Sequence, residues 1–197
     1  MVSPKDGQVY CTLTNNVKRG EDGQPVGGPN PREKNLYGQI LRWRETGDDH
    51  AAMTFAWDLF LIAGNPGVHP GTPQAGSANI TTQNMFNSPD GLGFDRDGRL
   101  WIQTDGDFSN SGEYAGMGNN QMLCADPASG EIRRFMVGPV GCEVTGISFA
   151  PDHRTLFVGI QHPGESGGST FPEHLPGGKP RSSVIAIRRE DGGMVGS

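Results

Sequence analysis

Several short segments of this chain carry acidic, amide and histidine side chains that could bind metal ions together. They are Ser88-Pro89-Asp90, Thr104-Asp105-Gly106-Asp107, Gly118-Asn119-Asn120, Gly141-Cys142-Glu143 and Gln161-His162-Pro163-Gly164-Glu165. Carboxylate and amide oxygens are hard donors that suit calcium or magnesium, and a histidine or thiolate beside them also permits iron, manganese or zinc. The side-chain types therefore predict a metal site if the fold brings these segments together.

Arg32, in the segment Asn30-Pro31-Arg32-Glu33, adds a side chain that could bind a phosphate group. A guanidinium fork holds two phosphate oxygens at once, while nearby cations offset the charge on the others. An arginine beside a metal cluster is therefore compatible with phosphoryl chemistry.

Each of these residues also has a purely structural interpretation. Asp90 can be an ordinary turn residue, and Asp105 can accept hydrogen bonds from its own backbone. His162 can be a loop histidine whose ring nitrogens have partners within the chain. Glu143 favours a ligand role more strongly, because it lies just before a strand-like run, where a carboxylate adds little to structure.

The elements that would position these segments come from a repeated strand, turn, strand unit. Its clear copies are Phe94-Asp95-Arg96-Asp97-Gly98-Arg99-Leu100-Trp101-Ile102 and Phe149-Ala150-Pro151-Asp152-His153-Arg154-Thr155-Leu156-Phe157-Val158, and Lys5-Asp6-Gly7-Gln8-Val9-Tyr10 is a third copy without its first strand. An acidic turn residue followed by an apolar, aromatic run is typical of two antiparallel strands joined by a tight turn. The spacing of 55 residues from Phe94 to Phe149 predicts stacked four-stranded blades.

The predicted fold is all-β, a partial β-propeller with about two and a half four-stranded blades. The expected strands are 9–14, 38–44, 53–62, 92–95, 99–104, 121–125, 131–137, 146–150, 155–161 and 183–188. They divide a single propeller segment, 1–197, into a partial blade (1–64), a complete blade (88–138) and a second partial blade (139–197). Residues 65–87, rich in Gly, Pro, Ser, Thr and Asn, are expected to form a long surface loop.

A closed propeller needs at least about four blades. We therefore expect this chain to be the C-terminal slice of a longer propeller, with open sheet edges that need a partner or a packing neighbour. Self-association through these edges is one way to cover them. In a propeller, the connection into the first strand of a blade and the connection out of its second strand lie at the same end of the ring. The candidate segments should therefore converge around the central channel.

Composition and charge exclude several other classes of protein. The chain has 31 glycines and 15 prolines among 197 residues, which is typical of a turn-rich β protein. Its net charge of −6, without any basic run, makes nucleic acid an unexpected partner. The longest apolar stretch, Leu59 to Gly64, is far shorter than the roughly 20 residues that span a bilayer, and no leader pattern opens the chain. The 3 cysteines lack C-x-x-C spacing, which favours buried free thiols over a zinc knuckle or a disulfide framework.

Consecutive motifs of this chain resemble the C-terminal part of the PhoX-type alkaline phosphatases. The strings that carry the resemblance are Val9-Tyr10-Cys11-Thr12-Leu13-Thr14-Asn15-Asn16, Asn30-Pro31-Arg32 with Tyr37-Gly38, Ser88-Pro89-Asp90, Leu100-Trp101-Ile102-Gln103-Thr104-Asp105-Gly106, Glu143-Val144-Thr145-Gly146, Ile160-Gln161-His162-Pro163-Gly164-Glu165 and Pro180-Arg181-Ser182. The resemblance runs from about residue 2 to the closing Arg188-Arg189-Glu190-Asp191-Gly192-Gly193. Because the motifs occur in the right order, the chain is identified as a member of this family.

The resemblance implies a six-bladed propeller with an iron and calcium cluster at the channel mouth. Such a protein hydrolyses phosphomonoesters in the periplasm or outside the cell, after export by the twin-arginine route. By resemblance, the acidic metal shell contains Asp90, Asp105 and Glu143. Weaker candidates are Asn120 and Gln161 as metal ligands and Arg32 as a catalytic residue.

This sequence departs from the family pattern in two respects. Gly91 stands where many relatives carry a side-chain amide, and the N-terminal half, which supplies a thiolate ligand and further acids, is absent. None of the cysteines is assigned the thiolate role, because all of them match the C-terminal half. We therefore expect this chain by itself to bind calcium weakly at most and to have little or no phosphatase activity.

Two alternative functions come from other classes. A lactonase-like, calcium-binding propeller enzyme also uses the Phe-x-x-Asp-Gly-x-Leu-Trp hairpin, although nothing in that function requires the segment from Gln161 to Glu165. A non-catalytic propeller fragment could instead recruit another chain by strand addition at its open edges.

Overall fold

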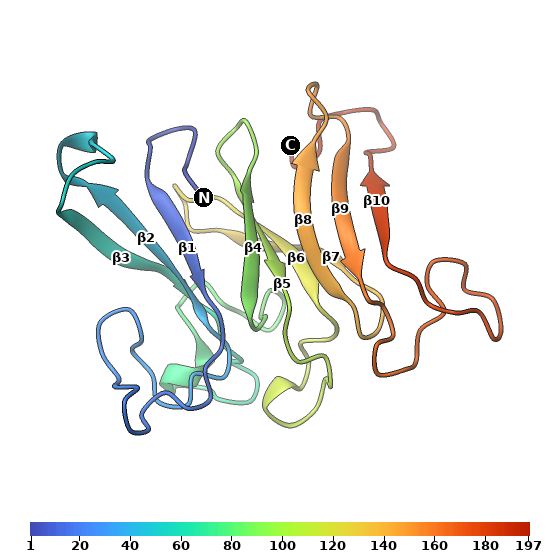
Figure 1. Ribbon diagram of the computed structural model, residues 1–197, viewed down its shortest axis with the longest axis horizontal. Coiled ribbons are helices and arrows are strands. Elements are labelled where there is room, and N and C mark those ends of the chain that lie inside the picture. Colours follow the sequence, from blue (N-terminus) through green and yellow to red (C-terminus); the bar gives the residue numbers. More distant parts are fainter.

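The computed structural model describes residues 1–197, and the regular secondary structure is almost entirely antiparallel β-strand, joined by long loops (Figure 1). The strands are β1 (Val9–Leu13), β2 (Gln39–Glu45), β3 (Phe55–Ile62), β4 (Pro89–Phe94), β5 (Leu100–Thr104), β6 (Gln121–Ala125), β7 (Ile132–Val137), β8 (Glu143–Phe149), β9 (Leu156–Gln161) and β10 (Ser183–Ile187). Short 3₁₀ helices at Thr46–Asp48, Pro73–Ala75 and Gly112–Tyr114 lie in the connections. Every strand predicted from the sequence is present. No helix has the length and the apolar run that crossing a bilayer requires.

The strands form three separate sheets that stand side by side (Figure 1). The first has the order β1-β2-β3, the second β4-β5-β6-β7 and the third β10-β9-β8. Strand β4 contacts both β1 and β8, so the inner strands of neighbouring sheets meet. The arrangement is open rather than closed into a ring, which confirms the predicted partial propeller.

The hairpin between β4 and β5 shows why the repeated sequence folds as it does. Asp95 is only 3% exposed, and its Oδ1 atom accepts hydrogen bonds from the backbone N–H groups of Asp97 (2.9 Å) and Arg99 (3.0 Å). Its Oδ2 atom accepts hydrogen bonds from Arg99 Nε (2.7 Å) and Trp101 Nε1 (3.1 Å). Gly98, with a φ of +84°, takes the left-handed position of the turn. Residues within one short segment therefore close this hairpin and neutralise its buried acid.

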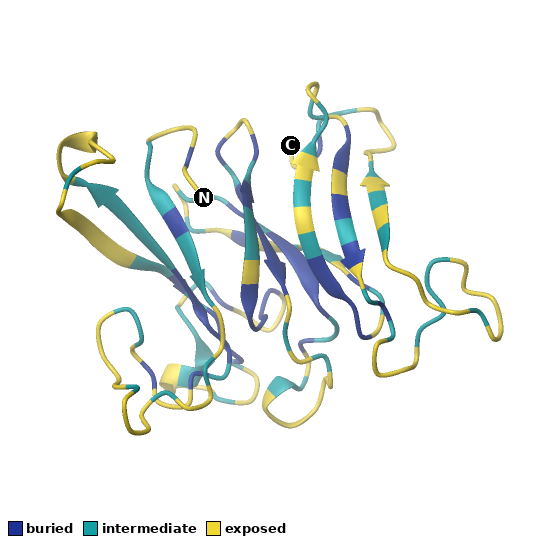
Figure 2. Ribbon diagram, viewed as in Figure 1, coloured by how far each residue is buried: buried dark blue, intermediate teal, exposed yellow.

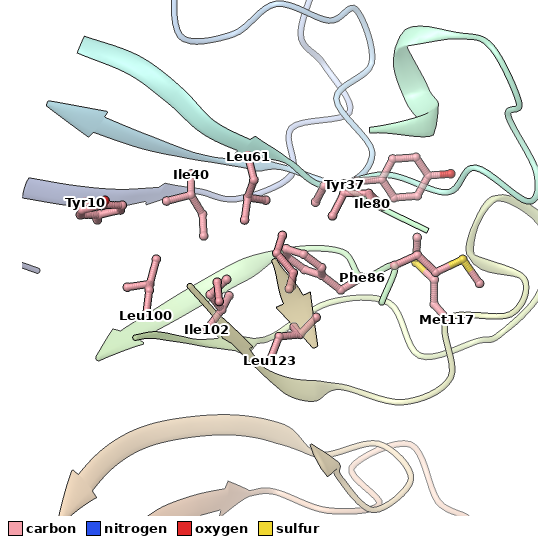
Figure 3. Close-up of a cluster of buried hydrophobic side chains, with 14 residues drawn as sticks. Tyr10, Tyr37, Ile40, Leu61, Ile80, Phe86, Leu100, Ile102, Met117 and Leu123 are labelled. Carbon is pink, nitrogen blue, oxygen red and sulfur yellow. The ribbon is translucent and has the colours of Figure 1, made fainter. Parts of the chain in front are cut away.

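Two apolar layers hold the three sheets together. The first layer places Tyr10, Ile40 and Leu61 of the first sheet against Leu100, Ile102 and Leu123 of the second (Figure 3). The second layer, between the second and third sheets, contains Trp101, Met122, Val144, Leu156, Val158 and Ile160. Strand β5 contributes to both layers, because successive side chains of a strand point to opposite faces of the sheet.

The segment 65–87 contains no strand, as predicted, but it is not only a surface loop. Ile80, Met85 and Phe86 are at most 5% exposed and belong to the first apolar layer. Phe86 and Ile80 appear beside Leu123 and Tyr37 in Figure 3. The expectation of a surface loop is therefore wrong for its second half, because scattered apolar residues in a polar segment become buried only when the two sheets meet.

Strands β4 and β8 begin earlier than the sequence pattern predicts. The pairing register shifts between Pro89 and Leu92 in β4 and between Thr145 and Ile147 in β8. Glycines lie within both irregularities, and Gly146 has a φ of +57°. A β-bulge interrupts the alternation of side chains that marks a strand in sequence, and bulges often re-aim side chains next to functional sites. Asp90 and Glu143 therefore lie on strands rather than in the loops before them.

The outer face of the first sheet is apolar and not covered by another sheet. The pairing register places Val9, Trp43 and Trp57 in one row across this face and Cys11, Leu41 and Leu59 in the next. We call these six residues the open face. Trp57 is 44% exposed, and the exposed part of β3 is visible in Figure 2. Self-association through the open sides of the molecule stays a prediction.

Candidate metal and phosphate site

Most of the predicted ligands lie at one end of the sheets, the lower end in Figure 1, where β4 and β8 begin and β5 and β9 end. Pro89 at the start of β4 pairs with Thr104 at the end of β5, and Glu143 pairs directly with Gln161. Residues from four strand ends and the loops that follow them therefore gather at this end. We call them the acidic rim, which consists of Asp90, Asp105, Glu143, Gln161 and His162.

Asp90 and Asp105 form the part of the rim that belongs to the second sheet. Both are exposed, and neither carboxylate has a hydrogen bond or an ion pair within the chain. Partial desolvation, together with the negative charge of Asp90, raises the pKa of Asp105 above its usual value. Nearby carboxylates that lack a positive partner favour binding of a cation, which would relieve their repulsion.

Glu143 and His162 form the part that belongs to the third sheet. Glu143 is 8% exposed, and its Oε2 atom lies 3.6 Å from His162 Nε2. The other ring nitrogen, Nδ1, lies 3.5 Å from Glu165 Oε2 but makes no hydrogen bond. The backbone of His162 has a positive φ of +35°, and its N–H donates to Ser182 Oγ at 2.8 Å. The histidine thus lies between two carboxylates and is the only side chain beside Glu143 that could carry a positive charge.

Asn120 is buried directly behind the rim, and both the oxygen and the nitrogen of its side-chain amide are hydrogen-bonded within the chain. The Oδ1 atom accepts hydrogen bonds from Thr104 Oγ1 (2.9 Å) and the N–H of Gly106 (2.7 Å). The Nδ2 atom donates to the carbonyl oxygens of Gly106 (3.1 Å) and Cys142 (2.9 Å). Asn120 therefore holds the hydroxyl of Thr104 just before Asp105, the backbone of Gly106 just after it, and the carbonyl immediately before Glu143. A direct ligand role for Asn120 stays a prediction, whereas this positioning role is visible.

Arg32 lies in the long connection between β1 and β2, and its guanidinium is bound by groups of the chain itself. It is 3% exposed and donates hydrogen bonds to the carbonyl oxygens of Ala63 (2.6 Å) and Gly38 (2.9 Å) and to Asn35 Oδ1 (2.6 Å). Burial lowers the pKa of Arg32 to about 10. The guanidinium thus ties together the segments around β2 and the end of β3, and its predicted catalytic role stays a prediction.

Gln103 is a buried polar residue beside the rim that the sequence analysis did not select. It is 1% exposed, and its Nε2 atom has no hydrogen-bond partner. The available signal was a glutamine in an otherwise apolar strand, Leu100–Thr104, which ends just before Asp105. A strand whose residues are all buried does not normally contain an amide without a partner.

The donor chemistry of the rim suits a hard cation, but the set of ligands is incomplete. No three His, Cys, Asp or Glu side chains of this chain lie close enough to hold a metal ion by themselves. Gln161 adds an exposed amide beside Glu143, and its ligand role stays a prediction. The rim can therefore contribute oxygen ligands to a cation site, with the other ligands coming from elsewhere.

The cysteines have no disulfide partner and should differ sharply in reactivity. Burial raises the pKa of Cys142 to about 11 and that of Cys124 to about 12, although Cys124 is partly exposed. Cys11 is also partly exposed and lies on the open face. Because the thiolate is the reactive form, only Cys11 should react quickly with a disulfide reagent at pH near 8. Titration should give one thiol per native chain and all three after unfolding, and Cys11→Ser should remove the fast one. Rapid reaction of all three thiols in the native protein would contradict these burial assignments.

Comparisons with known proteins agree with this geometry. The family model described as alkaline phosphatase PhoX matches residues 1–164. The solved structure of Pseudomonas fluorescens PhoX, in complex with the transition state analogue vanadate, is 84% identical in sequence with a TM-score of 0.98. That match covers 99% of this chain and 34% of the other, so this chain spans about a third of that protein's length.

A second solved structure, the gluconolactonase XC5397 from Xanthomonas campestris, is only 18% identical, with a TM-score of 0.38. That match covers 80% of this chain and 54% of the other, and a likeness at this level carries no argument about function. No curated protein matches this chain.

Proposed function

Because this chain belongs to the PhoX alkaline phosphatase family, we propose that it forms the C-terminal third of a metal-dependent enzyme that hydrolyses phosphomonoesters. The observation that carries the proposal is the acidic rim. Its carboxylates converge from separate strands, and Asp90 and Asp105 have no cationic partner within the chain. The relative that is 84% identical was solved in complex with vanadate, a transition state analogue, which supports phosphoryl transfer as the reaction of the whole protein.

The rim residues that would hold cations are Asp90, Asp105 and Glu143. We propose calcium and iron as the cations, on the grounds of family membership and of the oxygen donors present. When bound, such metal ions offset the charge of the phosphate group and activate the attacking oxygen. Asn120 holds the backbone around Asp105 and Glu143 in place, so that these side chains need little rearrangement when a cation binds.

The remaining ligands would come from the other two thirds of the parent protein. This division is consistent with the lack of any complete set of metal ligands in this chain. We also propose that the parent protein is exported by the twin-arginine route and acts outside the cytoplasm. This part of the proposal rests on family membership alone.

The isolated chain should therefore bind calcium weakly and should not turn over substrate. We expect a dissociation constant for calcium of about 10⁻⁴ to 10⁻³ M by calorimetry, which is the range of sites with few charged ligands. With iron and calcium supplied at neutral to alkaline pH, p-nitrophenyl phosphate should remain intact.

A matched control combines Asp90→Asn, Asp105→Asn and Glu143→Gln. This triple variant should abolish the heat of calcium binding without unfolding the chain. Appreciable turnover by the isolated chain would show that a third of the enzyme suffices. Unchanged calcium binding in the triple variant would show that the rim is not the site.

A further inference from the structure

Asn87 joins the segment before β4 to the loop after β5, and it does so through its side chain. Its Oδ1 atom accepts hydrogen bonds from the N–H of Asp107 (3.0 Å) and from Ser88 Oγ (3.0 Å). Its Nδ2 atom donates to the carbonyl oxygen of Asp107 (3.1 Å) and to Met117 Sδ (3.5 Å). The residue is 5% exposed, and both the oxygen and the nitrogen of its amide are bonded within the chain.

The amide of Asn87 continues the pairing of the two segments beyond the end of the sheet. The last backbone hydrogen bond between them runs from the N–H of Asp105 to the carbonyl oxygen of Ser88 (3.1 Å). Ser88 has a φ of +50°, so the backbone leaves the extended conformation at this residue. Asn87 then exchanges two hydrogen bonds with the backbone of Asp107, as a residue of a paired strand would.

Gly106 lies inside these contacts, and the glycine is required by space. A Cβ atom placed on it would be 1.8 Å from Asn87 Oδ1 and 2.7 Å from Ser88 Oγ. Its φ is not positive, so its backbone conformation alone does not require glycine. Its N–H donates to Asn120 Oδ1 (2.7 Å). The loop after Asp105 is therefore held from two sides, by Asn87 and by Asn120.

The contacts of Asn87 hold the two acids of the second sheet against their own repulsion. Asp90 lies three residues after Asn87, and Asp105 lies two residues before Asp107. Desolvation is the main cause of the raised pKa of Asp105, and the charge of Asp90 adds to it, so the two carboxylates are close enough to repel each other. Bonds between the two segments are needed to keep these carboxylates together before a cation binds.

We propose that Asn87 is a positioning residue that sets the spacing of the Asp90 and Asp105 carboxylates for cation binding, and so sets the calcium requirement of the whole enzyme. This inference deepens the proposed function and rests on it. Asn87 does not contact the cation itself, because both polar atoms of its amide are bonded within the chain. It acts through the backbone beside the two acids, as groups behind a metal ligand commonly do.

Asn84, three residues earlier in the same segment, offers a matched control. It is 8% exposed, and like Asn87 it accepts two hydrogen bonds and donates two. Its Oδ1 atom accepts from the N–H (2.6 Å) and Oγ1 (3.2 Å) of Thr81, and its Nδ2 atom donates to the carbonyl oxygens of Asn79 (3.0 Å) and Ile132 (2.9 Å). None of these partners belongs to the rim, so Asn84→Leu should cost stability without changing calcium binding.

The isolated chain gives a readout that does not depend on catalysis. Without calcium, Asn87→Leu and Asn84→Leu should lower the melting temperature by similar amounts, because each removes the hydrogen bonds of one buried amide. Calcium at about 10 mM should raise the melting temperature of the wild type and of Asn84→Leu, because a ligand that binds only the folded state stabilises it. Asn87→Leu should lose this rise. Gly106→Ala keeps the amide but displaces it, and should lose the rise as well.

The full-length parent enzyme tests the same inference through its calcium requirement. Asn87→Leu should raise the calcium concentration for half-maximal hydrolysis of p-nitrophenyl phosphate about 10- to 100-fold, which is the usual effect of removing a group that orients a metal ligand. Saturating calcium should return kcat to nearly the wild-type value. Asn84→Leu should leave the calcium requirement unchanged.

The variants separate positioning from general destabilisation. A rise in melting temperature with calcium as large in Asn87→Leu as in the wild type, or an unchanged calcium requirement in the parent, would overturn the inference. Equal loss of the calcium response in Asn84→Leu and Asn87→Leu would also overturn it. If Asn87→Leu does not fold, Gly106→Ala decides by the same criteria. A wild type without any calcium response, in the chain and in the parent, would overturn the proposed function and this inference with it.

Discussion

Glu143→Gln in the full-length parent enzyme should lower kcat/KM for p-nitrophenyl phosphate by about a thousandfold, which corresponds to ~4 kcal/mol of transition-state stabilisation. The change removes one negative charge and keeps the shape of the side chain. Glu143 is the best enclosed acid of the rim, because it is 8% exposed and has only His162 as a partner. A cation bound there would lose a ligand, and water could not easily take the place of that ligand because Glu143 is so little exposed.

The measurement is steady-state kinetics together with metal analysis of the purified variant. Metal content should fall along with activity, and added calcium should restore part of it. Glu131→Gln is the control, since this exposed glutamate pairs with Arg133 far from the rim and should change nothing. Activity within twofold of wild type in Glu143→Gln would exclude Glu143 as a ligand.

Asp95→Ala should lower the free energy of unfolding of this chain by about 3 to 4 kcal/mol and its melting temperature by about 10 °C. The substitution removes the acceptor of four hydrogen bonds, so that the N–H groups of Asp97 and Arg99 and the side-chain donors Arg99 Nε and Trp101 Nε1 all lose this partner. Arg99 would then be a mostly buried charge paired only with Asp97.

Urea and thermal unfolding followed by circular dichroism would measure this loss. Asp152→Ala is the matched control, because Asp152 occupies the corresponding turn of the third sheet but is exposed and accepts one hydrogen bond, from the N–H of Arg154 (3.0 Å). It should cost less than about 1 kcal/mol. Equal losses in the two variants would show that burial of the Asp95 network contributes nothing beyond the turn itself.

The strands could be predicted because their signals are local. Alternating apolar residues and acidic turns such as Asp95 and Asp152 are read within a few positions, and every expected strand is present. The starts of β4 and β8 could not be read in this way, because Gly91 and Gly146 interrupt the alternation at bulges. Burial of Phe86 could not be predicted either, because it depends on two sheets that meet far along the chain.

The shared end of the candidate residues could be predicted from the strand order, but their hydrogen-bond partners could not. The strand assignment placed Asp90, Asp105 and Glu143 at one end, since strand direction alone decides which loops share an end. The role of Arg32 as a tie between loop segments depends on a connection without a repeating pattern. The unpartnered amide nitrogen of Gln103 depends on packing between strands and has no counterpart in the local sequence.

Two tryptophans on the open face can report the assembly of this protein through their fluorescence. Trp43 and Trp57 lie on that face, whereas Trp101, the third tryptophan, is fully buried and hydrogen-bonded. Fluorescence from the first two should shift to shorter wavelength when another sheet covers them, while the contribution of Trp101 stays constant. Docking of another sheet on this face can therefore be followed by emission spectroscopy without any attached dye.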